Sequence, residues 1–244
     1  MSTVSKPQRS FWDMPADRFY LDQPLTSNLA IHGEELHHLH VMRIRKGEIL
    51  ELVNGQGELV EAVVEEIDKK IATLKIVSHI KKPSPIQKLI LAQALPRFSS
   101  LEWIVEKGTE LGVTEFWLFP GKLSEKTSLT TTQLHRLKTI SISALKQCGR
   151  LFLPQIVIKP VLDQWEKVEG SLFYGDIQTS NSLTGPFLNP VVFIIGPEKG
   201  FAPSEIDALR VLSAQPISLH KNILRAETAA ITALSQFYLT SSLS

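Results

Sequence analysis

Residues 191–201, VVFIIGPEKGF, decide the fold of this chain. The first five residues of this stretch are apolar and mostly β-branched, which is typical of a strand buried on both faces in a parallel α/β sheet. A Gly-Pro pair ends the strand and a short loop follows. Pro203 with Glu205 then predicts the first turn of a helix, because proline suits the first helical position and a carboxylate complements free backbone amides. The loop therefore lies at the carboxyl end of a core strand, where open α/β sheets bind ligands.

A second segment downstream, residues 217–230, has the sequence ISLHKNILRAETAA. It predicts a short strand at residues 217–219 and then a helix, whose small and apolar positions follow helical spacing: Ala226, Ala229, Ala230, Ala233, Leu234 and Phe237. That stripe is expected in the core. The unusual feature is the helix start, where Arg225, Glu227 and Thr228 place charged and hydroxyl groups beside alanine.

The two segments together, GPEKGF and ILRAETAA, resemble the family that methylates N3 of a uridine in 16S ribosomal RNA. That family belongs to the superfamily of knotted, S-adenosylmethionine-dependent methyltransferases called SPOUT. The similarity extends to EKGTELGV at residues 106–113, to QCGR at residues 147–150, and to residues 14–20 and 37–47, which look like the family's N-terminal RNA-binding domain. Several motifs in the right order, covering nearly the whole chain from about Met14, are far more specific than any one of them.

The resemblance implies an α/β fold with a C-terminal, mostly parallel sheet tied in a trefoil knot, preceded by a small PUA-like β-barrel domain. Physical rules alone favour an unknotted doubly wound sheet, so the knot rests on the resemblance. We expect a flexible N-terminal tail at residues 1–13, a PUA-like RNA-binding domain at residues 14–82 and a methyltransferase domain at residues 83–244. The charged, Pro-rich break KKPSP at residues 81–85 marks the boundary. Because the similarity begins at Met14, the tail is either an extension or precedes the true start.

The hydrophobic pattern changes at this boundary. Before it, an antiparallel barrel is predicted from strands at residues 18–21, 28–32, 48–53, 58–67 and 71–80, with a helix at residues 34–42. Beyond it, strands at residues 88–95, 116–119, 155–158, 171–174, 191–195 and 217–219 alternate with helices, two of them at residues 99–111 and 133–148.

Composition limits the class of protein. The 244 residues hold 26 basic and 25 acidic side chains, so RNA contacts must come from local patches rather than from an overall positive field. The single cysteine excludes an internal disulfide and a cysteine-based zinc site. No apolar run approaches the roughly 18 residues that span a membrane, and the first residues lack the apolar core of a signal peptide. We expect a cytoplasmic protein.

Three histidines crowd the first predicted helix. Their spacing puts only His37 and His40 on one face, with His38 beside them, so packing and hydrogen bonding are favoured over a metal site. We expect no bound metal.

Basic side chains supply the candidate RNA contacts. Arg43, Arg45 and Lys46 form a compact cluster, which is either a solvated face or a phosphate-contacting patch that orients RNA. The full set of candidates is Arg18, Arg43, Arg45, Lys46, Arg97 and Arg150. Lys107, Lys126 and Arg150 are interpreted as RNA contacts or as partners in ion pairs.

No G-x-G-x-x-G fingerprint and no P-loop follow any predicted strand. The resemblance instead implies S-adenosylmethionine, bent against the knot and held largely by main-chain groups of three loops. Carried over by position, the cofactor-binding candidates are Tyr174, Gly175, Ile195, Gly196, Pro197, Gly200, Leu219, Ile223, Leu224 and Thr228. Glycines would allow close approach of the backbone, and the apolar side chains would stack on the ligand.

Methyl transfer from a sulfonium to nitrogen needs positioning and removal of the weakly acidic N3 proton. Arg225 is a candidate to stabilise the uracilate, and Glu198 a candidate to accept the proton or to neutralise the sulfonium. The alternative for each is an ordinary surface or capping residue. Cys148 is disfavoured as a nucleophile, because direct N3 methylation needs no covalent intermediate.

The chain departs from the family pattern at several positions. Lys199, His220 and Ala202 stand where glycine, glycine and serine are usual, Asn222 where arginine is common, and Phe98-Ser99 where Gly-Asp is usual. These departures bear on activity rather than on fold. The expected partners are 16S rRNA of the small ribosomal subunit and a second copy of the chain, because the superfamily builds its site at a dimer interface. The alternatives are a catalytically silent RNA-binding protein and methylation of another RNA position.

Overall fold

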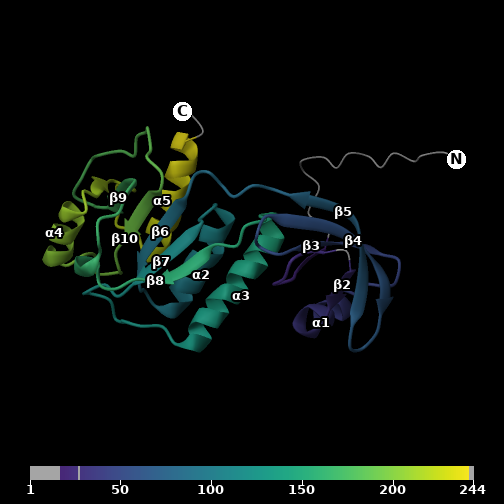
Figure 1. Ribbon diagram of the computed structural model, residues 1–244. Coiled ribbons are helices and arrows are strands. Elements are labelled where there is room, and N and C mark those ends of the chain that lie inside the picture. The colour runs from purple at the N-terminus through teal and green to yellow at the C-terminus, as the bar shows by residue number, and fades with distance from the viewer. Residues whose placement is uncertain (1–16, 27, 242–244) are drawn as a thin grey trace. The chain divides into compact units, whose positions relative to one another are not determined.

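The computed structural model describes residues 17–26 and 28–241 (Figure 1). The chain divides into two compact units, with the division between Lys82 and Pro83. The expected tail at residues 1–13, together with Met14, lies outside the described residues.

The N-terminal unit is a curled five-stranded sheet with the order β1-β3-β4-β5-β2. Its elements are β1 (Arg18–Tyr20), β2 (Asn28–Ile31), α1 (Gly33–Val41), β3 (Ile49–Val53), β4 (Glu58–Ile67) and β5 (Ala72–Lys81). The antiparallel prediction is confirmed for three of the pairs but is wrong for β1, which runs parallel to β3. Two register shifts between β4 and β5 strengthen the local twist and bend the sheet around its core.

The core of this unit fills the concave side of the sheet. Leu36 and Leu39 of α1 pack with Phe19, Leu52 and Leu74 of the strands, and all five are buried. Because α1 presents only these two buried side chains, its histidines stay at the rim of the core.

The C-terminal unit is a six-stranded, all-parallel sheet with the order β11-β9-β10-β6-β7-β8. The strands are β6 (Leu89–Ala94), β7 (Glu115–Phe119), β8 (Gln155–Ile158), β9 (Ser171–Gly175), β10 (Val191–Ile195) and β11 (Gln215–Ile217). The helices are α2 (Phe98–Glu110), α3 (Thr131–Cys148), η1 (Leu162–Gln164), α4 (Pro203–Val211) and α5 (Ala226–Ser241). The predicted α/β class and parallel sheet are confirmed, whereas the threading of α5 that defines a knot stays a prediction.

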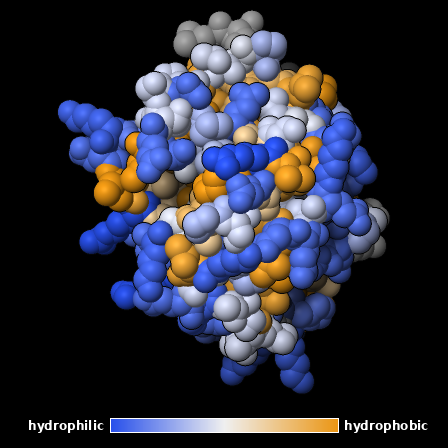
Figure 2. All heavy atoms as spheres, turned by 90° about the vertical axis from the view of Figure 1, so that its left-hand side faces the viewer, coloured by the Kyte–Doolittle hydropathy of each residue, from blue (hydrophilic) through white to orange (hydrophobic). Residues whose placement is uncertain are grey.

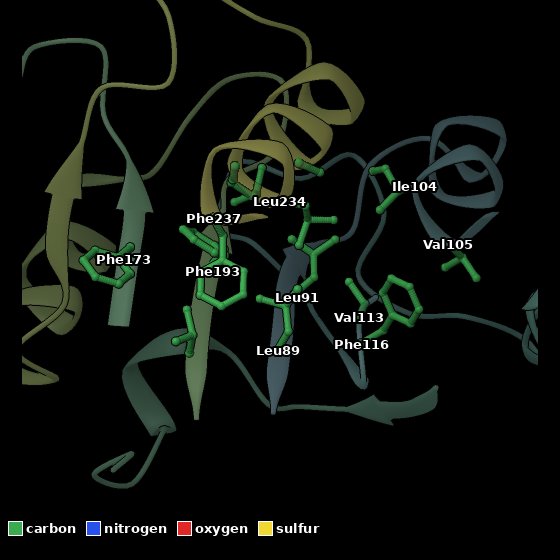
Figure 3. Packing of buried hydrophobic residues seen from close by; sticks show 14 of the residues in the cluster. Leu89, Leu91, Ile104, Val105, Val113, Phe116, Phe173, Phe193, Leu234 and Phe237 are labelled. Carbon is green, nitrogen blue, oxygen red and sulfur yellow. The ribbon is translucent and has the colours of Figure 1, made fainter. Parts of the chain in front are cut away.

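Strand β10 lies in the middle of this sheet, between β9 and β6, and all five of its residues are buried as predicted. Its side chains alternate between two cores. Phe193 packs with Leu234 and Phe237 of α5 on one face (Figure 3), and Ile194 packs with Leu209 of α4 on the other. Both faces of the strand are covered, which explains the continuous apolar run.

Two features differ from the predicted strands. Strand β11 begins at Gln215, two residues before the predicted start, and it ends at Ile217. Pro216 fits within β11 because this edge strand pairs only with β9 and needs no amide on its outer side. Leu219, predicted in the strand, therefore lies in the loop that leads to α5.

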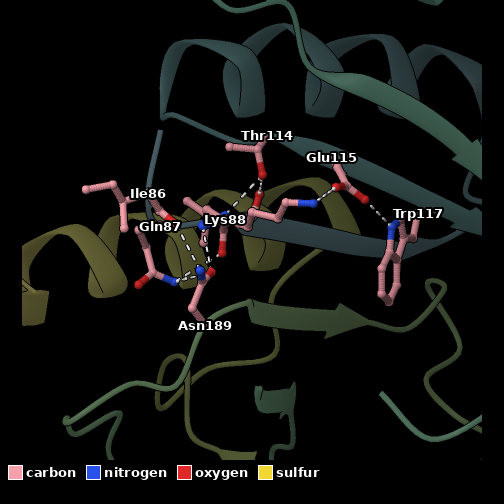
Figure 4. Close-up of polar contacts among 8 residues, drawn as sticks. Ile86, Gln87, Lys88, Thr114, Glu115, Trp117 and Asn189 are labelled. Carbon is pink, nitrogen blue, oxygen red and sulfur yellow. Dashed lines mark hydrogen bonds and ion pairs between the residues drawn. The ribbon is translucent and has the colours of Figure 1, made fainter. Parts of the chain in front are cut away.

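Side chains fix the register of the strands at the amino end of the sheet (Figure 4). The amide of Asn189 accepts a hydrogen bond from Lys88 N at 2.9 Å and donates one to the Ile86 carbonyl at 2.8 Å. The Thr114 hydroxyl accepts from Leu89 N at 3.1 Å. Because β6, β7 and β10 are held together here, their carboxyl ends are aligned at the opposite edge, where the candidate site lies.

Candidate active site

A pocket of about 520 Å³ lies at the carboxyl ends of β9, β10 and β11. This volume falls in the range of ordinary small-molecule sites. Three segments that are far apart in the sequence form it: residues 174–178, residues 195–201 and residues 219–224. Ile206 and Arg210 of α4 and Ala226 and Ala229 of α5 complete the wall.

The pocket gathers nine of the ten candidate cofactor-binding residues: Tyr174, Gly175, Ile195, Gly196, Pro197, Gly200, Leu219, Ile223 and Leu224. Thr228 is not part of the lining. It is exposed on the first turn of α5, and its carbonyl accepts a hydrogen bond from the Thr232 hydroxyl at 2.8 Å.

Three glycines lie where the pocket walls meet. A Cβ atom on Gly175 would lie 2.8 Å from Leu219 Cδ1, and one on Gly196 would lie 3.4 Å from the backbone of Gly200 and the ring of Phe201. Gly200 itself has φ +75°, which favours glycine. Glycine is thus favoured by the backbone at Gly200, while a side chain at Gly175 would displace the end of Leu219.

Gln93 fixes the end of β10 from the neighbouring strand β6. Its Nε2 donates to the Ala94 carbonyl at 2.9 Å and lies within 3.5 Å of the carbonyls of Ile195 and Gly196. The side chain is fully buried, and its Oε1 has no hydrogen-bond partner among the described residues. An uncharged amide thus holds the main chain at the point where it enters the pocket.

Glu198 lies at the edge of the pocket and is exposed. Its Oε1 accepts a hydrogen bond from Arg97 N at 3.3 Å, directly before α2. The Arg97 side chain extends to Glu125, with Nε 3.6 Å from Oε2. The structure thus brings together two of the candidate residues, Glu198 and Arg97, although they are about one hundred positions apart in the sequence.

Arg225 directly precedes α5, between Leu224 and Ala226, which both line the pocket. Its carbonyl begins the helix by accepting from Ala229 N at 2.8 Å. The side chain is exposed and forms no ion pair within residues 17–26 and 28–241. Arg225 itself is not among the lining residues, although both of its chain neighbours are.

His220 and Lys199 line the pocket and fit without backbone strain. Neither residue has a positive φ; among the described non-glycine residues only Arg43 and Ser213 do. His220 Nδ1 accepts a hydrogen bond from Asn222 N at 3.0 Å. In the neutral ring this contact puts the proton on Nε2, so the imidazole closes a turn in the loop and presents a donor on its other side.

Several lining residues were missed by the sequence analysis: Asp176, Ile177, Gln178, Phe201, Ile206, Arg210, Ala226 and Ala229. Asp176 could have been found, since it directly follows Gly175, a candidate residue just after the strand predicted at residues 171–174. Ile206 and Arg210 are four residues apart on α4 and so lie on one face of that helix. No local pattern indicates that this face turns to the pocket.

Apolar side chains on the face that carries α4 lie as separate groups between hydrophilic ones (Figure 2). Val211 of α4, for example, is 85% exposed. Scattered apolar side chains of this kind are usual on protein surfaces and do not by themselves indicate a binding partner.

Three of the RNA-contact candidates are exposed in the loop between α1 and β3, namely Arg43, Arg45 and Lys46. Backbone hydrogen bonds from Ile44 N to the Leu39 carbonyl and from Gly47 N to the Val64 carbonyl hold this loop. None of the three side chains has an ion pair within the described residues. The loop therefore presents three uncompensated positive charges on a fixed backbone.

Two other RNA-contact candidates are corrected by the structure. Arg18 is engaged by Glu51, with Nη2 2.7 Å from Oε2, and the two side chains are 9% and 6% exposed. Arg150 donates to the carbonyls of Thr109 and Val113 at 2.7 and 2.8 Å, which caps the end of α2. Both guanidinium groups are engaged by other groups of this chain, so we expect neither to contribute much to RNA binding.

The remaining charged candidates have local partners. Lys107 Nζ lies 2.7 Å from Glu106 and 2.9 Å from Glu110, and these hydrogen bonds raise its pKa. Lys126 Nζ lies 5.9 Å from the ring centre of Phe98. His40 Nε2 contacts the Asp68 carbonyl at 2.9 Å. The described residues contain no group of three or more side chains suited to hold a metal ion, and no helix among them is long and apolar enough to cross a membrane.

Comparisons with known proteins agree with this geometry. The family described as RNA methyltransferase domain matches residues 82–238, and the family described as RNA methyltransferase PUA domain matches residues 31–77. Ribosomal RNA small subunit methyltransferase E of Rickettsia conorii is 30% identical over 245 residues, which cover 94% of this chain and 98% of the relative. The corresponding protein of Synechocystis is 32% identical, over 88% of this chain and 74% of the relative.

Two solved structures have the same fold. A Legionella pneumophila protein in complex with the bound cofactor SAM has a TM-score of 0.83 and 29% identity, covering 93% of this chain and 98% of that one. Ribosomal RNA small subunit methyltransferase E from Neisseria gonorrhoeae, bound to S-adenosyl methionine, has a TM-score of 0.81 and 26% identity, with the same coverage. The chain belongs to the ribosomal RNA small subunit methyltransferase E family of RNA methyltransferases.

Proposed function

We propose that this protein transfers the methyl group of S-adenosylmethionine to N3 of a uridine in the 16S rRNA of the small ribosomal subunit. The observation that carries the proposal is the pocket at the carboxyl edge of the parallel sheet, where nine of the candidate cofactor-binding residues meet. The similar Legionella and Neisseria structures contain this cofactor.

The chemistry of the pocket fits S-adenosylmethionine. Apolar side chains such as Ile195 and Leu224 suit the adenine ring and the methionine chain, and the glycines at positions 175 and 196 leave main-chain groups accessible. Two carboxylates, Asp176 and Glu198, complement a cation. When bound, S-adenosylmethionine supplies an electrophilic methyl group on its sulfonium.

The groups for proton removal and charge stabilisation lie at the rim. Glu198 is held by a backbone N–H and retains a free carboxylate oxygen, so it can accept the N3 proton directly or through water. Arg225 carries an unpaired positive charge beside the pocket, where it can stabilise the uracilate formed when the proton leaves. His220 Nδ1 already accepts a hydrogen bond from Asn222 N, so it is not offered as the proton acceptor.

RNA would be held by phosphate contacts outside the pocket. The loop with Arg43, Arg45 and Lys46 offers three exposed cations on a fixed backbone, and Arg97, with a side chain 74% exposed, adds one near Glu198. The target base must be unstacked to reach the pocket. We further propose that the protein acts in the cytoplasm as a homodimer, as in the superfamily that it resembles.

Cofactor binding and product mapping test this proposal. Titration calorimetry of the full chain with S-adenosylmethionine should give one site per chain. Small subunits and naked 16S rRNA that lack the modification would then be incubated with protein and cofactor, and the RNA mapped by mass spectrometry. A methyl group on N3 of one uridine is expected. RNA binding without cofactor binding would favour a silent RNA-binding protein, and a methyl group elsewhere would overturn the N3 assignment.

A further inference from the structure

Glu205, in the first turn of α4, is a fully buried carboxylate that does not line the pocket. Its two oxygens contact different segments of the chain. Oε2 accepts a hydrogen bond from Ala202 N at 2.8 Å, and Oε1 accepts one from Lys122 N at 3.1 Å. A buried carboxylate is costly unless such donors compensate it, so this contact is specific rather than incidental.

The two segments joined by Glu205 have different positions relative to the pocket. Ala202 ends the loop between β10 and α4, and six consecutive residues of that loop, 196–201, line the pocket. Lys122 lies in the segment between β7 and α3, which contributes no lining residue. The carboxylate therefore connects the β10–α4 loop, which lines the pocket, to the β7–α3 segment, which does not.

Close packing reinforces the same junction. A Cβ atom on Gly121 would lie 3.1 Å from Ala94 Cβ and 3.4 Å from Cδ of Pro197, which is part of the pocket wall. The segment with Lys122 thus lies directly against the back of the pocket loop.

The Lys122 side chain adds a second connection around the buried one. Its Nζ lies 2.9 Å from the Ser204 hydroxyl and 2.6 Å from Asp163 Oδ2. The hydrogen bond from Lys122 lowers the pKa of Asp163, so this pair is charged at neutral pH. The outer contacts are half exposed, and we expect them to contribute less than the buried carboxylate.

We propose that Glu205 is a positioning residue for the cofactor pocket. It locks the β10–α4 loop onto the β7–α3 segment and so maintains the loop conformation that binds S-adenosylmethionine; the identity of this ligand rests on the proposed function. Glu205 acts without touching cofactor or substrate. If only the locked conformation binds, the apparent affinity falls in proportion to the fraction of molecules that are locked.

The test is Glu205→Gln, which keeps the shape of the side chain. The amide oxygen can accept only one of the two N–H groups, and the amide nitrogen then faces the other donor. We expect S-adenosylmethionine to bind about five- to 100-fold more weakly in titration calorimetry. Glu169→Gln is the matched control, because it removes the same charge from a side chain that is 85% exposed. Its affinity should equal that of the wild type.

Hydrogen exchange of the ligand-free protein separates positioning from general stability. In Glu205→Gln, the amides of Lys122, of Gly196 and of residues 198–202 should exchange faster, whereas β6 and β10 keep their protection. Wild-type affinity in this variant would overturn the proposal, as would faster exchange throughout β6 and β10. If the wild-type protein itself fails to bind the cofactor, the proposed function fails, and the exchange pattern still tests the lock.

A second variant serves if Glu205→Gln does not fold. Glu205→Asp keeps the charge but shortens the side chain, so that one carboxylate cannot reach both Ala202 N and Lys122 N. We expect the cofactor to bind at least about fivefold more weakly, with faster exchange confined to the same two segments. Wild-type values for both measurements would overturn the proposal.

Discussion

Replacement of Arg150 by alanine should destabilise the C-terminal unit without weakening RNA binding. The guanidinium donates to the carbonyls of Thr109 and Val113 at 2.7 and 2.8 Å, and to that of Gly112 at 3.3 Å. These carbonyls belong to the last turn of α2 and the residues after it, where the helix provides no donors. Partial burial of the guanidinium lowers its pKa.

The size of the effect follows from the hydrogen bonds. A hydrogen bond to a charged group contributes about 1.5–3 kcal/mol, and bonds made by one side chain are not additive. We therefore expect Arg150→Ala to lower the free energy of unfolding by about 3 kcal/mol. For a domain of this size, that loss corresponds to a fall in the melting temperature of about 6–12 °C.

Thermal unfolding followed by circular dichroism measures this loss, and RNA affinity is measured well below the transition. Arg150→Lys should fall between the wild type and the alanine variant, because an ammonium group lacks the fork of donors. Arg97→Ala, which removes a side chain that is 74% exposed, is the stability control and should change the melting temperature by about 1 °C at most. An unchanged melting temperature combined with a several-fold loss of RNA affinity in Arg150→Ala would refute the structural role.

Three further predictions concern the pocket and the N-terminal unit. Arg225→Ala should abolish turnover with little change in cofactor affinity, since the guanidinium has no partner within the described residues. Single-turnover rates measure the first quantity and calorimetry the second. Retained turnover would exclude a catalytic role for Arg225. His220→Ala removes the acceptor for Asn222 N, worth about 1 kcal/mol, so the cofactor should bind about fivefold more weakly. Tighter binding would mean that the ring crowds the pocket instead. Glu58 has a lowered pKa, chiefly because of its hydrogen bond with Lys81, so its contribution to stability is present above the ordinary value of 4.5 and is lost as the pH falls below it. Urea unfolding at pH 7 and pH 3 should show this loss in the wild type and a smaller one in Glu58→Gln.

Local patterns in the sequence predict most of the elements, because burial of side chains sets their spacing. The apolar run at Val191–Ile195 is buried on both faces, and α3 ends at Gly149, which has φ +83°. Pairing is harder to predict. The parallel contact of β1 with β3 and the early start of β11 depend on partners far away in the chain, and no local pattern encodes them.

The candidate site was also predictable only in part. Its glycines and apolar positions were predictable, since a pocket lined by main chain needs small residues at the ends of strands. Asp176 and Arg210 enter it only because the sheet order brings the ends of β9 and β10 beside α4. Whether Lys199 and His220 strain their loops could not be predicted from the sequence, because it depends on the backbone conformation. Neither residue has a positive φ, so neither position requires glycine.

Charged residues show most clearly why a sequence alone overestimates an RNA-binding surface. Arg18 and Arg150 are as basic in the sequence as Arg43, but Arg18 is paired with Glu51 inside the N-terminal unit and Arg150 caps α2. Glu205 is an acidic example of the same effect. Its place in the sequence indicates only a helix start, whereas its carboxylate also binds Lys122 N, 83 residues away in the sequence. A basic side chain is available to bind RNA phosphate where no group of the protein pairs with it. Among the RNA-contact candidates, Arg43, Arg45 and Lys46 meet that criterion, whereas Arg97 lies 3.6 Å from Glu125. Salt-dependent RNA affinity should therefore follow these three residues rather than the total basic charge of the chain.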